Sequence, residues 1–237
     1  MRRRTAAPRR APHAFRGFTL VELLVALAAM ALLAMLSWRG LDGMTRAQAY
    51  TRDRADQVLA LQAGLAQWGA DLDAVVQTPQ VNAIDWDGRG LRLTRRGSTA
   101  ESDGIVVVAW TRRVIDGNGQ WLRWQSPPLH RRVDLLEAWA RAAQWAQNPG
   151  EEDRRREVMV VPIDQWQIFY YRSDAWTNPL SSDGSTATAV AASAGTGNTA
   201  TTVPDGVRLV LTLSAGQAIT GALTRDWVRP TLGGGKS

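Results

Sequence analysis

The feature that most constrains this chain is an apolar run of 21 residues near its N-terminus, from Phe18 to Trp38. Glu22 is the only charged residue in this run. As a helix, the run would rise about 31 Å, which is enough to cross the hydrocarbon core of a bilayer. Six arginines and no acidic residue precede it. By the positive-inside rule we expect a single span with a cytoplasmic N-terminus, and we expect everything after Trp38 to be exported.

The carboxylate of Glu22 needs a reason, because a charge inside a membrane helix costs about 2.5–3.5 kcal/mol on insertion scales. Residues 17–22 read Gly-Phe-Thr-Leu-Val-Glu, behind a basic leader and ahead of the apolar run. This order resembles the prepilin-type cleavage and methylation motif. The resemblance implies that a prepilin peptidase cuts between Gly17 and Phe18 and methylates the new amino group of Phe18. It also implies that Glu22 pairs with the N-terminal amine of a neighbouring subunit during filament assembly.

Elementary electrostatics agrees with this interpretation. Cleavage would create a cation four residues, or about 6 Å, from Glu22. A second subunit displaced along the filament could bring its ammonium group to the carboxylate, so that neither charge stays unpaired in lipid. A generic signal anchor explains the length and charge bias but not the residue order. An ordinary cleaved signal peptide has a shorter apolar region, and Ala31 and Ala34 are too far apart for its small-x-small cleavage site.

Composition excludes a strong nucleic-acid bias once the leader is set apart. The whole chain carries a net charge of +6, from 28 basic and 22 acidic residues. Removing the six arginines of residues 1–17 from the 28 leaves 22 basic residues, so the mature chain is neutral and no nucleic-acid partner is expected. The chain has no cysteine, and therefore neither a disulfide nor a thiol nucleophile.

A helical pattern continues beyond the membrane run, and we expect one helix from about Phe18 to Val76, ended by Pro79. Its exported half carries apolar residues at spacings of three and four, which indicate an amphipathic stripe. We expect this stripe to pack against the chain's own sheet, with contact to a partner helix as the alternative. The stripe residues are Val58, Leu61, Leu65, Trp68, Leu72 and Val75.

The pattern changes to strands beyond Pro79. Gly117-Asn118-Gly119 is the expected hairpin turn, and residues 134–147 are expected to form a helix. The expected strands cover residues 91–94, 105–110, 113–116, 120–124, 158–161, 165–171, 207–213 and 219–228. A lone N-terminal helix followed by antiparallel strands predicts an α+β fold with the helix covering one sheet face, which is the pilin-like architecture.

The predicted domain organisation follows the chain in order. Residues 1–17 are a cleaved leader, 18–38 the transmembrane segment and 39–78 the periplasmic continuation of the helix. Residues 79–232 are the β-rich periplasmic domain, in which the Ser/Thr/Ala/Gly-rich segment 178–204 is expected to be a mobile loop, and residues 233–237 are a tail.

Within the pilin-like architecture the details resemble the J-type minor pseudopilins of type II secretion. The resemblance rests on segments 38–42, 71–73, 114–124, 169–176 and 204–209. It implies a non-enzymatic inner-membrane subunit that joins minor pseudopilins of the I, K and H types at a filament tip, with the major pseudopilin as a further candidate partner. The alternatives are a minor pilin of a type IV pilus and a membrane-anchored periplasmic binding module that does not polymerise.

Catalytic and metal chemistry have little support in the sequence. His13 lies in the leader and His130 stands alone beside two prolines, so no catalytic residue is assigned. Residues 85–88 (Asp-Trp-Asp-Gly) are similar to the start of a calcium loop but lack its later ligands, and we read them as a turn; no metal or cofactor is expected. Residues 151–156 are expected to be a solvated loop with internal charge pairing. Several of the 11 tryptophans fall in expected strands, where they would fill core or anchor an interface.

Overall fold

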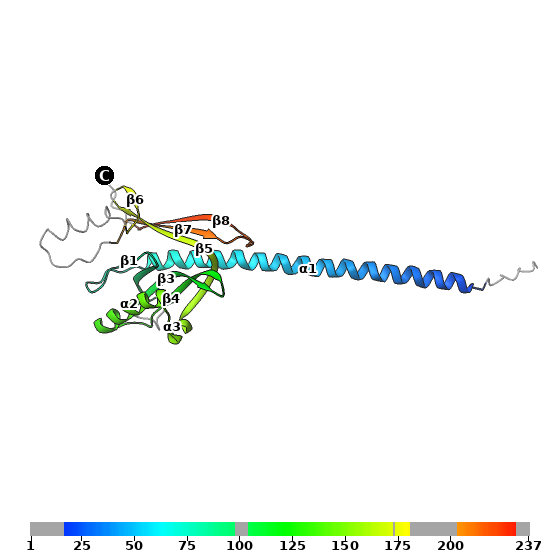
Figure 1. The fold of residues 1–237 in the computed structure, drawn as a ribbon, viewed down its shortest axis with the longest axis horizontal. Helices are drawn as coiled ribbons and strands as arrows, with labels where there is room; N and C mark the ends of the chain where they lie inside the picture. Colours follow the sequence, from blue (N-terminus) through cyan, green and yellow to red (C-terminus); the bar gives the residue numbers. More distant parts are fainter. Residues whose placement is uncertain (1–16, 98–103, 173, 181–202, 231–237) are drawn as a thin grey trace, which may run out of the picture. The chain divides into compact units, whose positions relative to one another are not determined.

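The computed structural model describes residues 17–97, 104–172, 174–180 and 203–230 (Figure 1). The chain forms two compact units, one up to Arg52 and one from Asp53 onward, and each is described by itself. The predicted leader before Gly17, most of the predicted loop 178–204 and the predicted tail lie outside the described residues.

Helix α1 (Leu20–Asp73) is the long helix predicted from the sequence, although it ends three residues earlier than expected. The part of α1 that belongs to the first unit exposes its side chains almost throughout, including Leu20 at 76% and Trp38 at 73%. Among the described residues, this is the one helix whose length and apolar composition are sufficient to cross a membrane. An apolar surface of this kind on a helix is stable in lipid and unfavourable in water.

In the residues that the structure describes, the second unit combines the end of α1 with two shorter helices and eight strands. The helices are α2 (Arg132–Gln147) and α3 (Glu151–Arg155). The first five strands are β1 (Ile84–Trp86), β2 (Gly90–Arg96), β3 (Ile105–Ile115), β4 (Asn118–Gln125) and β5 (Glu157–Arg172). The last three are β6 (Ala175–Thr177), β7 (Gly206–Leu213) and β8 (Gly221–Val228). The fold is α+β and pilin-like, as predicted.

All the strand pairs are antiparallel, and their order is β1-β2-β3-β4-β5-β7-β8, with β6 on β5. Strand β5 pairs through its first half with β4 and through its second half with β7, and the pairing shifts at Asp164, between Ile163 and Gln165. The two strands predicted at 158–161 and 165–171 are therefore one bent strand. A β-bulge bends a strand without ending it, so Pro162 and Asp164, which lie between the two predicted segments, wrongly indicated a break.

The hairpin between β3 and β4 turns one residue earlier than predicted. Ile115 pairs with Asn118, and the two turn residues have positive φ, 50° at Asp116 and 80° at Gly117. This is the two-residue type I′ geometry that Asp-Gly favours. The prediction of a Gly117–Gly119 turn is therefore wrong, because Gly119 already lies in β4. The segments predicted at 105–110 and 113–116 are likewise joined in one strand, β3.

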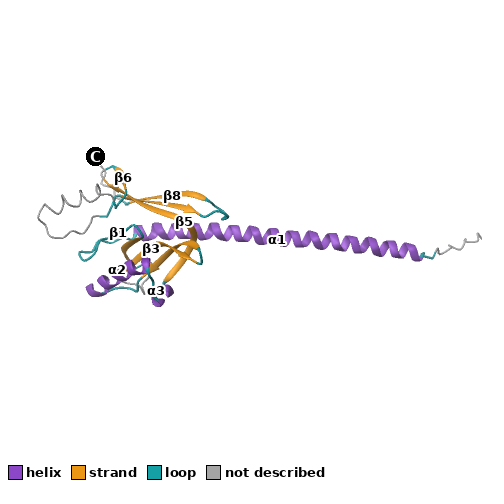
Figure 2. Ribbon diagram, viewed as in Figure 1, coloured by secondary structure: helices purple, strands orange, loops and turns teal. Residues whose placement is uncertain are grey.

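The core lies on both faces of the β1–β5 sheet. On one face, Leu61, Trp68 and Leu72 of α1 are buried and Leu65 and Val75 are partly buried, which confirms that the predicted stripe packs on the chain's own sheet. Helix α2 lies on the other face (Figure 2). It buries its own apolar side there. The residues of this second cluster include Val107, Ala109, Leu122, Trp124, Leu135, Ala142 and Trp145. Because β3 is covered on both faces, it is an almost uninterrupted apolar run.

The acidic and basic segment at 151–156 is a short helix and not the predicted loop. The carboxylate of Asp153 accepts a hydrogen bond from the N–H of Gly150 at 3.3 Å, and Arg156 pairs with Glu152 at 3.4 Å. The internal charge pairing was therefore predicted correctly. The spacing of three and four residues between opposite charges, which is the spacing of helix neighbours, was the signal for a helix.

Candidate functional site

The residues of the predicted processing motif meet at the N-terminus of α1. The side-chain Oγ1 of Thr19 accepts a hydrogen bond from the N–H of Glu22 at 3.3 Å. In return, Glu22 Oε2 accepts from the Thr19 N–H at 3.0 Å and from its hydroxyl at 2.9 Å. This reciprocal arrangement is a capping box, in which a Thr-x-x-Glu sequence satisfies two of the otherwise unpaired donors of a helix start.

The Gly17–Phe18 peptide bond lies before the first helical residue. Residues 17–19 have no helical assignment, and a Cβ placed on Gly17 would meet no atom within 4 Å. The side chain of Phe18 is 82% exposed. A peptidase that binds its substrate in an extended conformation could therefore reach this bond without unwinding α1. Cleavage there and methylation of Phe18 remain predictions.

Within the first unit, Glu22 has one described partner, Thr19, and that partner is neutral. The capping box hydrogen-bonds the carboxylate but leaves its charge uncompensated. A carboxylate in an apolar segment is most stable beside a cation, so the arrangement is suited to exchange the Thr19 contacts for an ammonium group. The assembly role of Glu22 also remains a prediction.

The second unit contains a site that the sequence reasoning missed, a buried carboxylate at the end of α1. Asp71 is 0% exposed. It pairs with Arg95 of β2 at 2.5 Å and with Arg123 of β4 at 2.8 Å. The indole N–H of Trp110 and the side-chain amide of Gln67 each donate to it at 2.9 Å. One carboxylate thus fixes the last turn of α1 to three neighbouring strands.

A signal for this site was present in the sequence. Asp71 follows Trp68 by three residues and therefore falls on the apolar stripe, where a charged side chain is unexpected. Two residues further on, the carboxylate of Asp73 accepts from the Trp227 indole N–H at 2.8 Å and fixes the helix to β8 as well. These contacts position the helix; they do not form a chemical centre.

The remaining candidate residues do not gather into a reactive site. His130 is exposed. Asp85 and Trp86 lie in strand β1, so the predicted turn at residues 85–88 is confined to Asp87 and Gly88. The carboxylate of Asp87 accepts hydrogen bonds from the backbone N–H groups of Arg89 and Gly90 at 2.9 and 2.8 Å. In the described ranges no group of three or more His, Cys, Asp or Glu side chains could hold a metal. Burial raises the pKa of the Tyr170 phenol far above its usual value, so this hydroxyl stays neutral. Trp68, Trp110, Trp121, Trp124 and Trp145 are fully buried, which assigns these tryptophans to the core.

Comparison with known proteins agrees with the fold and the motif. Residues 12–38 match the model of the prokaryotic N-terminal methylation motif. An apolar N-terminal helix that carries this motif, followed by an antiparallel α+β domain, defines a pilin-like protein. The chain is also 40% identical over 93 residues to the type II secretion system protein J of Klebsiella pneumoniae. That alignment covers 39% of this chain and 44% of the relative. Together the two matches support a pseudopilin of the J type with a single membrane helix.

Proposed function

We propose that this protein is a minor pseudopilin that joins other minor pseudopilins at the tip of a periplasmic filament in type II secretion, where it starts assembly and supports the export of folded proteins. The observation that carries the proposal is the processing motif at an accessible helix N-terminus, combined with the similarity to a type II secretion protein J. We further propose a cytoplasmic N-terminus, a periplasmic second unit and processing by a prepilin peptidase.

The mechanism of assembly follows from the capping box. In the free subunit, Glu22 is held by Thr19 through hydrogen bonds alone. When a neighbouring subunit presents its N-terminal amine, an ion pair between this amine and the Glu22 carboxylate replaces these contacts. Neither charge is then unpaired in the lipid. The same step selects correctly processed subunits, because an unprocessed chain has no amine at this position. The partners that fit this step are minor pseudopilins of the I, K and H types and the major pseudopilin.

Replacement of Glu22 in the native host tests the proposal. A strain without the chromosomal gene is complemented with the wild-type chain or with Glu22→Ala, and a secreted enzyme is measured in the medium and in the periplasm. We expect Glu22→Ala to insert into the inner membrane at the wild-type level and to leave most of the enzyme in the periplasm. Exposed Arg225, on β8 and far in sequence from the motif, supplies the control variant Arg225→Gln.

Assembly can be measured separately from secretion. Because the chain has no cysteine, a single cysteine introduced into the exposed part of α1 reports disulfide capture by a partner that carries one matching cysteine. We expect capture by minor pseudopilins in the wild-type background and its loss in Glu22→Ala. Normal secretion and capture with Glu22→Ala would instead indicate an anchored periplasmic module. Loss of pili with intact secretion in the deletion strain would indicate a type IV minor pilin.

A further inference from the structure

One tryptophan differs from all the others in its surroundings. The chain has 11 tryptophans, and every one of them lies in the described residues. Trp38, on the part of α1 that belongs to the first unit, is 73% exposed, whereas all the others are buried or half-buried. A large aromatic side chain left on the surface of a helix indicates that something outside this chain covers it.

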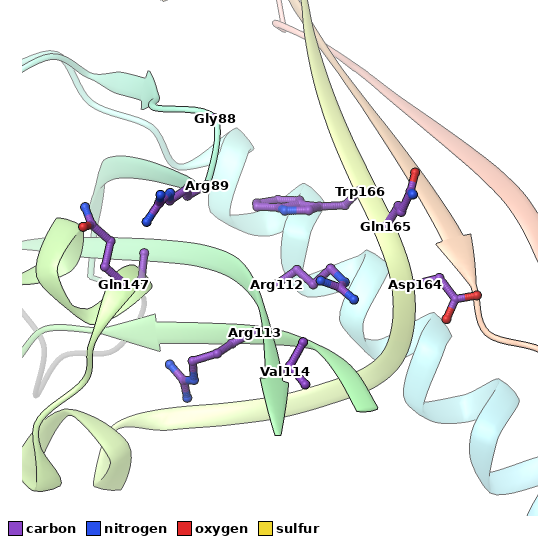
Figure 3. A pocket seen from close by; sticks show the side chains of 10 residues that line it. Gly88, Arg89, Arg112, Arg113, Val114, Gln147, Asp164, Gln165 and Trp166 are labelled. Atoms are coloured by element: carbon purple, nitrogen blue, oxygen red, sulfur yellow. The ribbon is translucent and has the colours of Figure 1, made fainter. Parts of the chain in front are cut away.

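The half-buried tryptophans of the second unit have packing partners within the chain. Trp166, for example, lines a pocket beside the bend of β5 (Figure 3) and packs edge-on against another indole there. Trp38 has no such partner: no described residue stacks on its ring or accepts a hydrogen bond from its indole N–H. The partners of the half-buried rings are Arg92 for Trp139 at 5.0 Å, Trp86 for Trp166 at 4.8 Å and Arg208 for Trp176 at 4.2 Å.

The position of Trp38 coincides with the end of the apolar run. No charged residue lies between Glu22 and Arg39, and the exposed ion pair of Asp42 with Arg46, at 2.8 Å, follows one turn later. An indole joins a large apolar ring to a single N–H donor. It is therefore most stable at a membrane–water interface, where lipid covers the ring and the N–H reaches water or a headgroup.

The helix converts the depth of Trp38 into a depth for the processing motif. Helix α1 is continuous from Leu20 to Asp73, so Trp38 lies about 27 Å along the axis from Leu20. The two residues before Leu20 are not helical and add up to about 7 Å. The hydrocarbon core of a bilayer is about 30 Å thick. With Trp38 at one boundary of this core, the Gly17–Phe18 bond lies at the other.

The position of Glu22 independently favours the same depth. Its Cα lies about 24 Å along the axis from that of Trp38, and hence about 6 Å inside the opposite boundary. An ionised side chain is less costly there than at the bilayer centre. Movement of α1 by one turn in one direction would bury Glu22 more deeply, and movement in the other would bring Arg39 into the hydrocarbon. Both charges are therefore best accommodated with Trp38 at the boundary.

We propose that Trp38 is a positioning residue that binds the lipid headgroup region on the periplasmic side of the membrane. The fixed length of α1 then holds the Gly17–Phe18 bond at the cytoplasmic boundary, where a peptidase can reach it. The statement about cleavage rests on the proposed function, whereas the location of Trp38 in the bilayer does not.

The first test measures the depth of Trp38 directly. The full chain is reconstituted into phosphatidylcholine vesicles whose acyl chains carry bromine either next to the headgroup or near the bilayer centre. The difference in tryptophan fluorescence between the wild type and Trp38→Phe isolates the emission of Trp38. We expect bromine next to the headgroup to quench this emission at least about twofold more strongly. Equal or stronger quenching from the bilayer centre, or none from either position, would overturn the proposal.

The second test moves the indole along α1. Because the chain has no cysteine, Leu20→Cys supplies a single thiol at the start of the helix. Its labelling by an impermeant maleimide is followed in inverted inner-membrane vesicles from a host without prepilin peptidase. Met35 and Leu41 lie one turn on either side of Trp38 and are 64% and 58% exposed, so an indole fits at either position.

Trp38→Leu combined with Met35→Trp should draw the thiol about 4.5 Å into the hydrocarbon. Labelling should then be at least about fivefold slower, because the thiolate is the reactive species and a low dielectric disfavours it. Trp38→Leu combined with Leu41→Trp should not slow labelling, and the matched control Trp38→Tyr, which keeps an interfacial aromatic ring, should stay within about twofold of the wild-type rate.

Equal labelling rates in the two shifted variants would overturn the positioning role. Cleavage is measured separately by pulse-chase in a host that has the peptidase, and the variant with the indole at position 35 should be processed more slowly than the wild type. Labelling that follows the indole while the wild-type chain stays uncleaved would refute the proposed function and still support the role of Trp38 at the membrane surface.

Discussion

Replacement of Asp71 by alanine should strongly destabilise the second unit. The substitution leaves the guanidinium groups of Arg95 and Arg123 without their shared carboxylate, and these side chains are only 7% and 13% exposed. Removal of one partner from a buried ion pair costs about 3–5 kcal/mol. For a domain of this size each kcal/mol lowers the melting temperature by about 2–4 °C, so the expected decrease is about 6–20 °C.

The assay is urea unfolding of the full chain in detergent micelles, followed by tryptophan fluorescence. This readout is direct because the indole N–H of Trp110 donates to Asp71, and the ring centroids of Trp110 and Trp121 are 4.4 Å apart. The control is Asp226→Asn, which breaks an exposed pair and should change the free energy of unfolding by less than about 1 kcal/mol. A change below about 1 kcal/mol for Asp71→Ala would refute the reasoning, because removing one partner of a buried pair is expected to cost several times more.

A compensated variant distinguishes the unpaired charges from a general packing defect. Asp71→Leu alone should be as destabilising as Asp71→Ala. Combining it with Arg95→Met and Arg123→Met removes the uncompensated charges as well, and apolar replacements of whole buried ion networks are often close to neutral. We therefore expect the triple variant to be more stable than the single one. A triple variant that is still less stable than Asp71→Leu would show that the arginines do not act through their charge.

Three further predictions concern packing, turn geometry and pH. Gly64→Ala should lower the free energy of unfolding by about 1–3 kcal/mol through overpacking, because the new Cβ would lie 2.2 Å from a valine side chain of β5. Gly69→Ala is the matched control: its Cβ would meet nothing within 4 Å, so it should stabilise α1 by up to about 1 kcal/mol. Gly117→Val should cost at least about 1–2 kcal/mol at its φ of 80°, measured by thermal unfolding. The hydrogen bond from Arg208 lowers the pKa of the Asp226 carboxyl. This pair therefore stabilises the fold at neutral pH and loses its effect as the pH falls through that lowered pKa. The stability difference between wild type and Asp226→Asn should vanish once the pH lies below that lowered pKa, and a difference that grows on acidification would contradict the assignment.

Local features of the sequence were sufficient to predict the helix, the hydrophobic stripe and most strands. Each of these features can be recognised from residues that are close in the sequence. Examples are the apolar run that ends at Trp38 and the three- and four-residue spacing of apolar residues from Val58 to Val75. The same holds for the capping box, which the order of residues 19–22 already contains. The processing motif was therefore readable before any tertiary contact was known.

The features that the sequence did not predict depend on distant partners. Asp71 interacts with Arg95 and Arg123, which are 24 and 52 residues away, and no local pattern specifies such a network. The continuity of β5 through its bulge was missed because Pro162 and Asp164 also occur at strand ends.

The most direct test of the account is the intact mass and N-terminal sequence of the protein extracted from the membranes of its own host, with Gly17→Ala measured in parallel. The account predicts a mature chain that begins at N-methylated Phe18 in the wild type, and an unprocessed chain in the variant. A wild-type chain that keeps its leader, or one cleaved near residue 34, would contradict the assignment as a pseudopilin.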